Sequence, residues 1–133
     1  MDELKQNAMM AHLIDALEKG QDVGHYGRLT LAMVGRHFMD HEELCDLLAK
    51  CPGSTREEVE VMVRQVEAKG YNPPKRDRIL QWQQEQEFPI CPNPDDPDAC
   101  NVYKDLKFPD SMYKKIEHYQ EEKMEAEQKT PAA

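Results

Sequence analysis

Hydrophobic residues recur at helical spacing in several separate stretches of this chain. The first stretch has an apolar face formed by Met9, Met10, Leu13, Ile14 and Leu17. Gly20 is expected to end this helix, and Gly24 precedes a second one, from about Tyr26 to Phe38. Because the second stretch is apolar on most sides, we expect it to lie at the centre of the fold.

Polar caps and glycines predict two more helices before residue 71. Asp40 is suited to cap a short third helix, which Cys51-Pro52-Gly53 is expected to end. Ser54 and Glu57 have the spacing of a capping box, which predicts a fourth helix that runs from Ser54 to Gly70. The apolar positions of these two helices are Leu44, Leu47, Leu48, Val59, Met62, Val63 and Val66.

Proline divides the second half of the chain. Pro73-Pro74 excludes a helix locally, and a fifth helix is expected from Ile79 to Glu87, with Trp82 as the only tryptophan. Residues 89–109 hold five of the nine prolines and predict a long irregular segment. Such segments are usually functional or tied down by a ligand.

A last helix is expected to start near Asp110. The tail at 121–133 is charged and has little to bury, so we expect it to be disordered. The pattern as a whole predicts an all-α fold, with a single helical domain of about six helices over residues 1–120.

Composition narrows the class of protein. The chain has 133 residues, of which 39% are hydrophobic and 32% charged, as in one globular domain with a modest core. No apolar run approaches the roughly 20 residues that span a bilayer. The N-terminus lacks the layout of a signal peptide. We therefore expect a cytoplasmic protein that does not contact a membrane.

The four cysteines of a cytoplasmic chain are expected to be reduced, as metal ligands or core residues before disulfides. Cys91 and Cys100 are the candidate metal ligands, but zinc and four-iron sites usually need four ligands. Cys45 and Cys51 are interpreted as buried structural thiols. Three histidines have no partner at a spacing typical of a metal site, namely His12, His41 and His118.

His25 and Arg28 form the first candidate binding site. Residues three apart share a helix face, so the two side chains can converge at the start of the second helix. The free amides and dipole of a helix start favour anions, and arginine grips phosphate with two hydrogen bonds. Arg36 could extend this basic strip. The alternative is a solvated arginine beside a capping histidine.

A second group of candidate residues flanks the Pro-Pro turn. Lys75, Arg76 and Arg78 form the densest cationic cluster, and Trp82 lies one turn further on. Cations beside an aromatic ring suit a single nucleic-acid strand with a stacked base, although tryptophan is more often a core residue. The formal net charge of −9 disfavours non-specific coating of nucleic acid but allows a local site.

Catalysis has little support in the sequence. The chain has no Gly-rich phosphate loop, no nucleophile signature and no zinc-protease motif. We therefore expect that the protein is not an enzyme.

Several motifs follow one another in a defined order. They are His25-Tyr26-Gly27-Arg28 at the start of an apolar helix, Tyr71-Asn72-Pro73-Pro74, Cys91-Pro92, Cys100 and Phe108-Pro109-Asp110. In this order and spacing they resemble the iron–sulfur domain of the large subunit of archaeal and eukaryotic DNA primase. The resemblance covers roughly residues 9–119 and implies the helical fold of that domain.

The resemblance also implies a role in DNA replication. In the family, this domain is not the polymerase but holds the template and the 5′-triphosphate end of the primer. By this likeness His25 and Arg28 would contact phosphate, with Arg36, Lys75, Arg76 and Arg78 as secondary cations. The implied partners are a DNA or RNA primer–template with a 5′-triphosphate, and a primase catalytic subunit or primase-polymerase. The chain begins almost at this domain, so we expect a free-standing accessory subunit or a module that acts in trans.

The ligand set of the family is incomplete in this chain. Two of the four cysteine positions fall near Met9 or Met10 and on Arg76. A guanidinium cannot coordinate iron and a thioether is a weak ligand, so we expect no cofactor. A 4Fe–4S cluster would need another cysteine beside Cys91 and Cys100. Without a cluster, a buried methionine and the stem of Arg76 are expected to fill the vacated site.

Three other functions compete with this hypothesis. A protein-interaction module without nucleic-acid binding is favoured by the negative net charge. A metal-cluster-dependent binding domain would use Cys91 and Cys100. A helix-turn-helix regulator is disfavoured, because Glu57, Glu58 and Glu60 would face phosphates at the start of the recognition helix.

Overall fold

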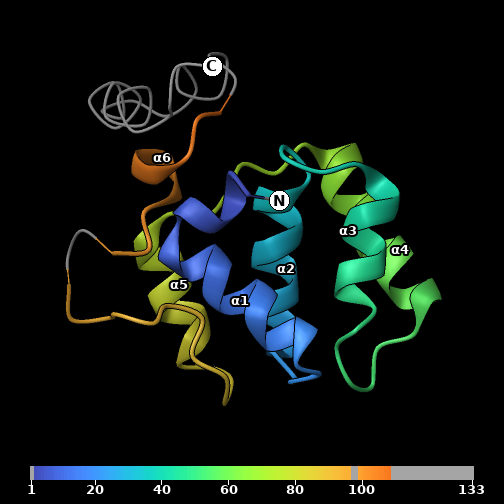
Figure 1. The fold of residues 1–133 in the computed structure, drawn as a ribbon, viewed down its shortest axis with the longest axis horizontal. Coiled ribbons are helices and arrows are strands. Elements are labelled where there is room, and N and C mark those ends of the chain that lie inside the picture. The colour runs from blue at the N-terminus through green and yellow to red at the C-terminus, as the bar shows by residue number, and fades with distance from the viewer. Residues whose placement is uncertain (1, 97–98, 109–133) are drawn as a thin grey trace.

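The computed structural model describes residues 2–96 and 99–108, and the regular structure of these residues is all helical (Figure 1). A short 3₁₀-helix precedes six α-helices. They are η1 (Leu4–Gln6), α1 (Ala8–Glu18), α2 (Gly24–Gly35), α3 (His41–Leu48), α4 (Arg56–Lys69), α5 (Arg76–Gln83) and α6 (Val102–Asp105). The predicted all-α class and single domain are thus confirmed. The helix expected from Asp110 and the tail at 121–133 lie outside the described residues.

Side-chain caps fix the starts of α1 and α3. The side chain of Asn7 accepts a hydrogen bond from the amide of Met10 at 3.0 Å. Asp40 accepts one from the amide of Glu43 at 2.8 Å, which confirms the predicted cap of α3. Each cap satisfies an amide that has no partner inside its helix, so the two helix starts follow from local sequence.

The start of α4 differs from the predicted capping box. The sequence predicts Ser54 as the cap, but the hydroxyl of Thr55 accepts the hydrogen bond from the amide of Glu58, at 3.2 Å. Ser54 instead accepts a hydrogen bond from the guanidinium of Arg28 in α2. The contact between Ser54 and Arg28 therefore explains why Thr55, and not Ser54, caps α4. The predicted end is confirmed, since Gly70 adopts a left-handed conformation with φ 61°.

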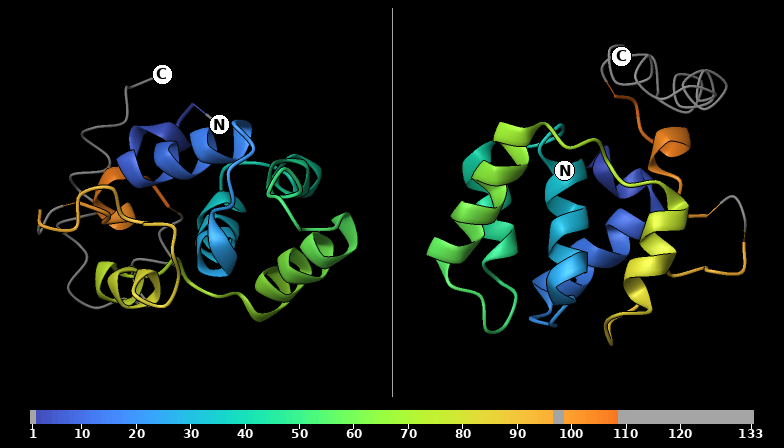
Figure 2. Two further views of the ribbon diagram at one scale, coloured as in Figure 1. Left: turned by 90° about the horizontal axis from the view of Figure 1, so that it is seen from below. Right: turned by 180° about the vertical axis from the view of Figure 1, so that it is seen from behind.

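Helix α2 lies at the centre of the described fold and contacts α1, α3, α4 and α5 (Figures 1 and 2). Leu31, Ala32 and Val34 on this helix are fully buried, which confirms its predicted central position. It ends at Gly35 rather than at Phe38, because the next residues form a turn with tighter hydrogen bonds to the third residue back.

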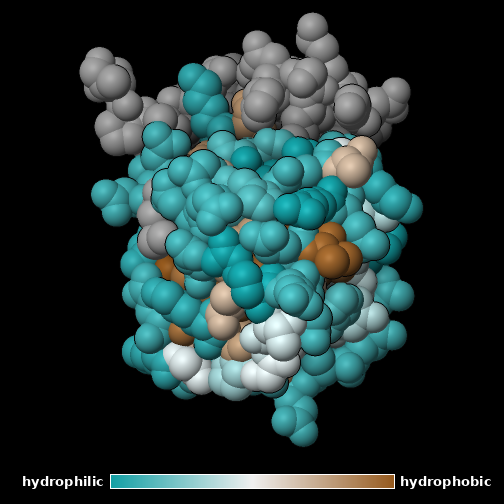
Figure 3. Space-filling view, turned by 90° about the vertical axis from the view of Figure 1, so that its right-hand side faces the viewer, coloured by the Kyte–Doolittle hydropathy of each residue, from teal (hydrophilic) through white to brown (hydrophobic). Residues whose placement is uncertain are grey.

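Helix α5 is displaced from its predicted bounds. The sequence predicts Ile79 to Glu87, whereas the helix begins at Arg76, directly after the Pro-Pro turn, and ends at Gln83. The segment that joins α4 to α5 crosses beside α2, so α2 has α4 on one side and α5 on the other (Figure 2, right). The face of the molecule that carries α3 and α4 is mostly hydrophilic (Figure 3).

The proline-rich segment is tied down by buried side chains. Ile90, Val102 and Tyr103 are buried, and the Tyr103 hydroxyl donates a hydrogen bond to the carbonyl of Pro73. The short helix α6 was not predicted from the sequence. Its cap is Asn101, which accepts a hydrogen bond from the amide of Tyr103 at 3.1 Å.

Cys91 and Cys100 form a disulfide in this segment. The sequence favours reduced thiols and leaves open whether these two cysteines pair on oxidation. Both residues are buried, and their Cα atoms lie 5.7 Å apart, within the usual range for a disulfide. Their separation of nine residues does not by itself reveal that the two cysteines lie this close. No helix among the described residues is both long enough and apolar enough to cross a membrane.

Candidate functional site

Two adjoining pockets lie along α2. The first, of about 410 Å³, lies between α2 and α4, and the second, of about 610 Å³, lies between α2 and α5. Leu29 and Tyr71 line both pockets, and we call the two together the α2 groove. Its charged and aromatic lining residues are His25, Arg28, Glu58, Tyr71, Lys75, Asp77, Arg78 and Trp82.

Five of the seven predicted nucleic-acid residues line this groove. His25 and Arg28 lie in the pocket beside α4, and Lys75, Arg78 and Trp82 lie in the pocket beside α5. They come from two segments that are far apart in the sequence, and the packing of α5 against α2 brings them together.

The two remaining predicted cations are not among the residues that line the groove. Arg36, just after α2, donates a hydrogen bond to the carbonyl of Tyr71 at 3.4 Å. Arg76 donates one to the carbonyl of Pro94 at 2.6 Å, in the loop closed by the disulfide. Both guanidiniums therefore bind backbone carbonyls. Each also has a buried Nε atom without a partner among the described residues.

Arg28 is half-buried and already has polar neighbours. Its guanidinium donates a hydrogen bond to Ser54 and lies 4.0 Å from the sulfur of Cys51. The thiol of Cys51 donates to the carboxylate of Asp22 at 3.3 Å. Hydrogen bonds from the Gly24 amide and from Cys51, with the charge of Arg28, lower the pKa of Asp22. An anion bound by Arg28 would share the guanidinium with this neighbouring negative charge.

Two backbone amides at the start of α2 already have side-chain partners. The sequence predicts free amides there, but the amide of Gly24 donates to Asp22 at 2.8 Å. The amide of Tyr26 donates to the side chain of Gln86 at 3.0 Å. With these two amides occupied, a phosphate in the groove would be held mainly by the side chains of His25 and Arg28.

Trp82 packs α5 against α2. Its ring stacks on Tyr26, with centroids 5.2 Å apart and an interplanar angle of 16°, and the guanidinium carbon of Arg78 lies 5.9 Å from its centroid. One ring face of Trp82 is thus covered by Tyr26. Tyr71 is 43% exposed and is the more open aromatic residue of the groove. The sequence feature that could have identified Tyr71 as a groove residue is its position just before the Pro-Pro turn.

The lining of the groove is mixed in charge and partly apolar. Glu58 and Asp77 face the same space as the cations. Among the described residues, Val61 and Tyr71 are the exposed large hydrophobic residues, at 57% and 43%, and both line the first pocket. The groove therefore offers isolated cations and an apolar surface rather than a broad basic surface.

The predicted metal ligands do not present free thiolates. Cys91 and Cys100 are bonded to each other, so either could bind a metal only after reduction. Cys45 and Cys51 are free and buried, as predicted. Met9 and Met10 lie at or near a position where the resemblance would place a cysteine ligand. Both side chains are fully buried.

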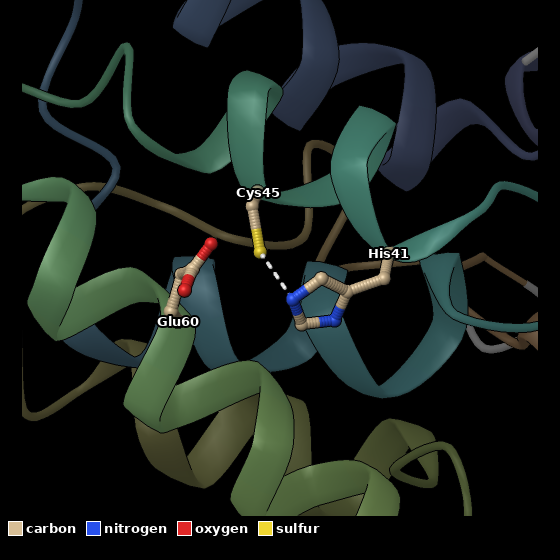
Figure 4. A group of neighbouring side chains, drawn as sticks. All are labelled: His41, Cys45 and Glu60. Carbon is tan, nitrogen blue, oxygen red and sulfur yellow. Dashed lines mark hydrogen bonds between the residues drawn. The ribbon is translucent and has the colours of Figure 1, made fainter.

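A different group of side chains, of the kinds that serve as metal ligands, lies between α3 and α4 (Figure 4). It consists of His41, Cys45 and Glu60, and it corrects the sequence expectation that His41 has no partner at metal spacing. The signal in the sequence is the four-residue spacing of His41 and Cys45, which places both on one helix face. Glu60 comes from another helix, so only the fold reveals it. Burial raises the pKa of the Cys45 thiol.

The side chains that line the groove are of kinds that bind phosphate and bases. Arginine and histidine can hold a phosphate, and an exposed tyrosine can stack on a base. The group between α3 and α4 can hold a metal ion, independently of the groove. No protein-family model, no curated protein and no solved structure matches this chain.

Proposed function

We propose that this chain is a non-catalytic nucleic-acid-binding module that holds a template strand and the 5′-phosphate end of a primer for a primase. The observation that carries the proposal is the position of His25, Arg28, Lys75 and Arg78 along one groove. Proteins that bind single strands combine such cations with aromatic rings, and Tyr71 lies where the two pockets meet. The order of motifs along the chain supports the primase assignment.

The two ends of the groove would have different roles. Arg28 and His25 would hold the terminal phosphates of the primer, because a guanidinium binds two phosphate oxygens at once. Lys75 and Arg78 would follow the backbone of the strand, and Tyr71 would stack on a base between them. Since Glu58 and Asp77 also line the groove, binding should involve few phosphates, so the binding constant should fall only moderately with salt.

A protein-interaction module is the second candidate, and one observation favours it. Val61 and Tyr71 are the exposed large hydrophobic residues of the described part, and they lie together at one pocket. A groove with an apolar lining can accept the apolar face of a helix or an extended peptide. The net charge of −9 would then select a basic partner.

The intrinsic fluorescence of Trp82 tests the nucleic-acid proposal directly. Trp82 is the only tryptophan of the chain and lines the groove. A primed template with a 5′-triphosphate should change this fluorescence saturably at low salt. The logarithm of the binding constant should fall with the logarithm of salt concentration with a slope of roughly 1.4 to 2.1, for two or three phosphates.

Three variants make this experiment specific. Arg28→Ala and Arg78→Ala should weaken binding. Arg64→Ala is the matched control, because Arg64 is an exposed arginine on α4 that pairs with Glu60 and does not line the groove. Absence of binding at low salt, or equal binding by all three variants, would refute the proposal. Binding of a basic peptide that is lost in Val61→Asp would instead support the second candidate.

A further inference from the structure

Three potential metal ligands converge between α3 and α4. His41 is the first residue of α3, Cys45 lies one turn further along the same face, and Glu60 projects from α4 toward them (Figure 4). One ligand atom from each residue lies within 4.8 Å of the other two. By helical periodicity, Glu60 points away from the face of α4 that lines the α2 groove, so this cluster is separate from the groove.

The spacing of the first two ligand atoms fits a tetrahedral ion. The Nε2 atom of His41 lies 3.5 Å from the sulfur of Cys45. Zinc binds nitrogen at about 2.0–2.1 Å and thiolate sulfur at about 2.3 Å, which places two such ligands about 3.5 Å apart at a tetrahedral angle. These two atoms therefore need little movement, and the carboxylate of Glu60 needs only a side-chain adjustment to reach the same ion.

A second carboxylate orients the imidazole of His41. Its Nδ1 atom lies 2.9 Å from Oε1 of Glu67, so the ring donates its proton there. The lone pair of Nε2 then points toward Cys45 and Glu60. Histidines that bind metals commonly donate their other ring nitrogen to a carboxylate, which fixes the tautomer and raises the basicity of the ligand. Glu67 thus occupies the position that such a supporting carboxylate would take.

The surroundings of the cluster allow a metal to enter and to be charge-balanced. The side chains of His41 and Glu60 are 30% and 28% exposed, whereas Cys45 is fully buried. One thiolate and one carboxylate would neutralise a divalent cation. A thiol among the ligands disfavours magnesium and calcium, which prefer oxygen, and favours zinc.

Arginines now hold the carboxylate of Glu60. Arg56 contacts one oxygen at 3.3 Å and Arg64 contacts the other at 3.4 Å, and both distances are long for charge-assisted hydrogen bonds. Arg56 also pairs with Glu42 and Asp46. It therefore keeps carboxylate partners if Glu60 turns toward a metal, and the cost of that turn is small.

We infer that His41, Cys45 and Glu60 bind one zinc ion, with Glu67 as the residue that orients His41 and a water molecule in the fourth position. The thiol of Cys45 gives up its proton to solvent when the metal binds. The ion would join α3 to α4. This site does not depend on the proposed nucleic-acid function, because none of its three ligands lines the α2 groove.

Cobalt and zinc titrations of the full chain test this inference. Protein stripped of metal with a chelator should bind one Co²⁺ per chain and develop a cobalt–thiolate absorption band, which one equivalent of Zn²⁺ should remove. Zinc should also raise the thermal midpoint of unfolding, because it binds the folded chain. Cys45→Ser should abolish the band, whereas Cys51→Ser, which changes the other free buried cysteine, should keep it.

Variants at the partly exposed positions separate metal binding from folding. His41→Gln and Glu60→Gln should lower zinc affinity at least tenfold while the circular dichroism of the metal-free chain is retained. Glu67→Gln should lower it about 10- to 100-fold, the usual effect of losing such a supporting carboxylate. Glu57→Gln, an exposed glutamate on the same helix, is the matched control and should leave the affinity unchanged.

Two results would overturn the site. One is a folded chain that binds no zinc and shows no cobalt–thiolate band. The other is binding that persists in both His41→Gln and Glu60→Gln but disappears in the Cys91→Ser/Cys100→Ser double variant. That pattern would place the metal on the reduced Cys91 and Cys100 pair. Because neither readout uses nucleic acid, failure here leaves the proposed function to its own test.

Discussion

The side-chain oxygen of Gln86 accepts a hydrogen bond from the backbone amide of Tyr26 at 3.0 Å. The nitrogen of the same side chain donates to the carbonyls of Val23, at 2.8 Å, and Phe88, at 2.9 Å. One amide side chain thus joins the start of α2 to the segment after α5. Gly24 makes room for it, because a Cβ atom there would lie 2.5 Å from the Gln86 oxygen.

Replacing Gln86 with alanine should destabilise the fold. Gln86→Ala leaves two carbonyls and one amide without their partner, so the free energy of unfolding should fall by about 1–3 kcal/mol. Gln84→Ala is the matched control, because Gln84 is exposed and its change should stay within about 0.5 kcal/mol. Urea unfolding measures both. Equal unfolding midpoints for the two variants would show that Gln86 does not hold α2 and α5 together.

The disulfide between Cys91 and Cys100 should contribute measurable stability. It closes a short loop, so the loop-closure relation gives about 2–3 kcal/mol for the Cys91→Ser/Cys100→Ser variant. A reductant should lower the unfolding midpoint of the unmodified chain and leave that of the double variant unchanged.

A thiol count checks the same bond independently. The chain denatured without reductant should present two reactive thiols, those of Cys45 and Cys51. Four reactive thiols in freshly purified protein would contradict the disulfide. They would return Cys91 and Cys100 to the role of reduced candidate ligands.

Helix ends with local signals could be predicted from the sequence, and those decided by tertiary contacts could not. Asp40 and Gly70 act within their own turns, and both are placed as the sequence predicts. Ser54 and Thr55 are equally suited to cap α4, and only the contact with Arg28 separates them. Helix α6 is too short for a periodic signal, and its burial depends on residues from distant segments.

In the candidate sites, too, local sequence predicts some features, whereas others depend on how the helices pack. The convergence of His25 and Arg28 follows from helical spacing alone, and both line the α2 groove. Their meeting with Lys75 and Arg78 depends on how α5 packs against α2. Glu60 lies on a different helix from its partners, and no local pattern connects it to them.

His37 should make the stability of the fold depend on pH. Burial, followed by the charge of Arg36, lowers the pKa of His37 from 6.5 to about 4. Its Nε2 atom is buried without a partner among the described residues, and its ring packs edge-on against Phe108. In the unfolded chain the imidazole of His37 takes up a proton near pH 6.5, whereas in the folded chain it takes one up only near pH 4. The free energy of unfolding should therefore fall as pH decreases from 6.5 to 4.

The size of this effect is limited by the remaining exposure of His37. One pKa unit corresponds to about 1.4 kcal/mol, and a ring that is still partly exposed should give less than the full shift. Urea midpoints between pH 7 and pH 4 measure it. His37→Gln should show a shallower dependence than the unmodified chain, whereas His25→Gln, at an exposed position, should show the same one. Parallel curves for His37→Gln and the unmodified chain would exclude His37 as the cause.

Arg28 should distinguish a triphosphate end from an ordinary strand. If its guanidinium holds the terminal phosphates, Arg28→Ala should weaken binding of a triphosphorylated primer–template by about 1.5–3 kcal/mol, the cost of a lost charge-assisted hydrogen bond. Fluorescence anisotropy with 5′-triphosphate and 5′-hydroxyl primers measures this difference. Arg78→Ala should weaken both primers alike, because Arg78 lies at the other end of the groove.

Ser54→Ala controls for the local structure around Arg28. It removes the hydroxyl that accepts from Arg28 but keeps the guanidinium, so binding should be retained or strengthened. If Ser54→Ala weakens binding as much as Arg28→Ala does, Arg28 serves to position α4 rather than to hold phosphate. If Arg28→Ala weakens binding of the triphosphate and hydroxyl primers equally, the groove reads the nucleic-acid backbone and not the primer end. Selective loss of the triphosphate primer is the result that the proposed function requires.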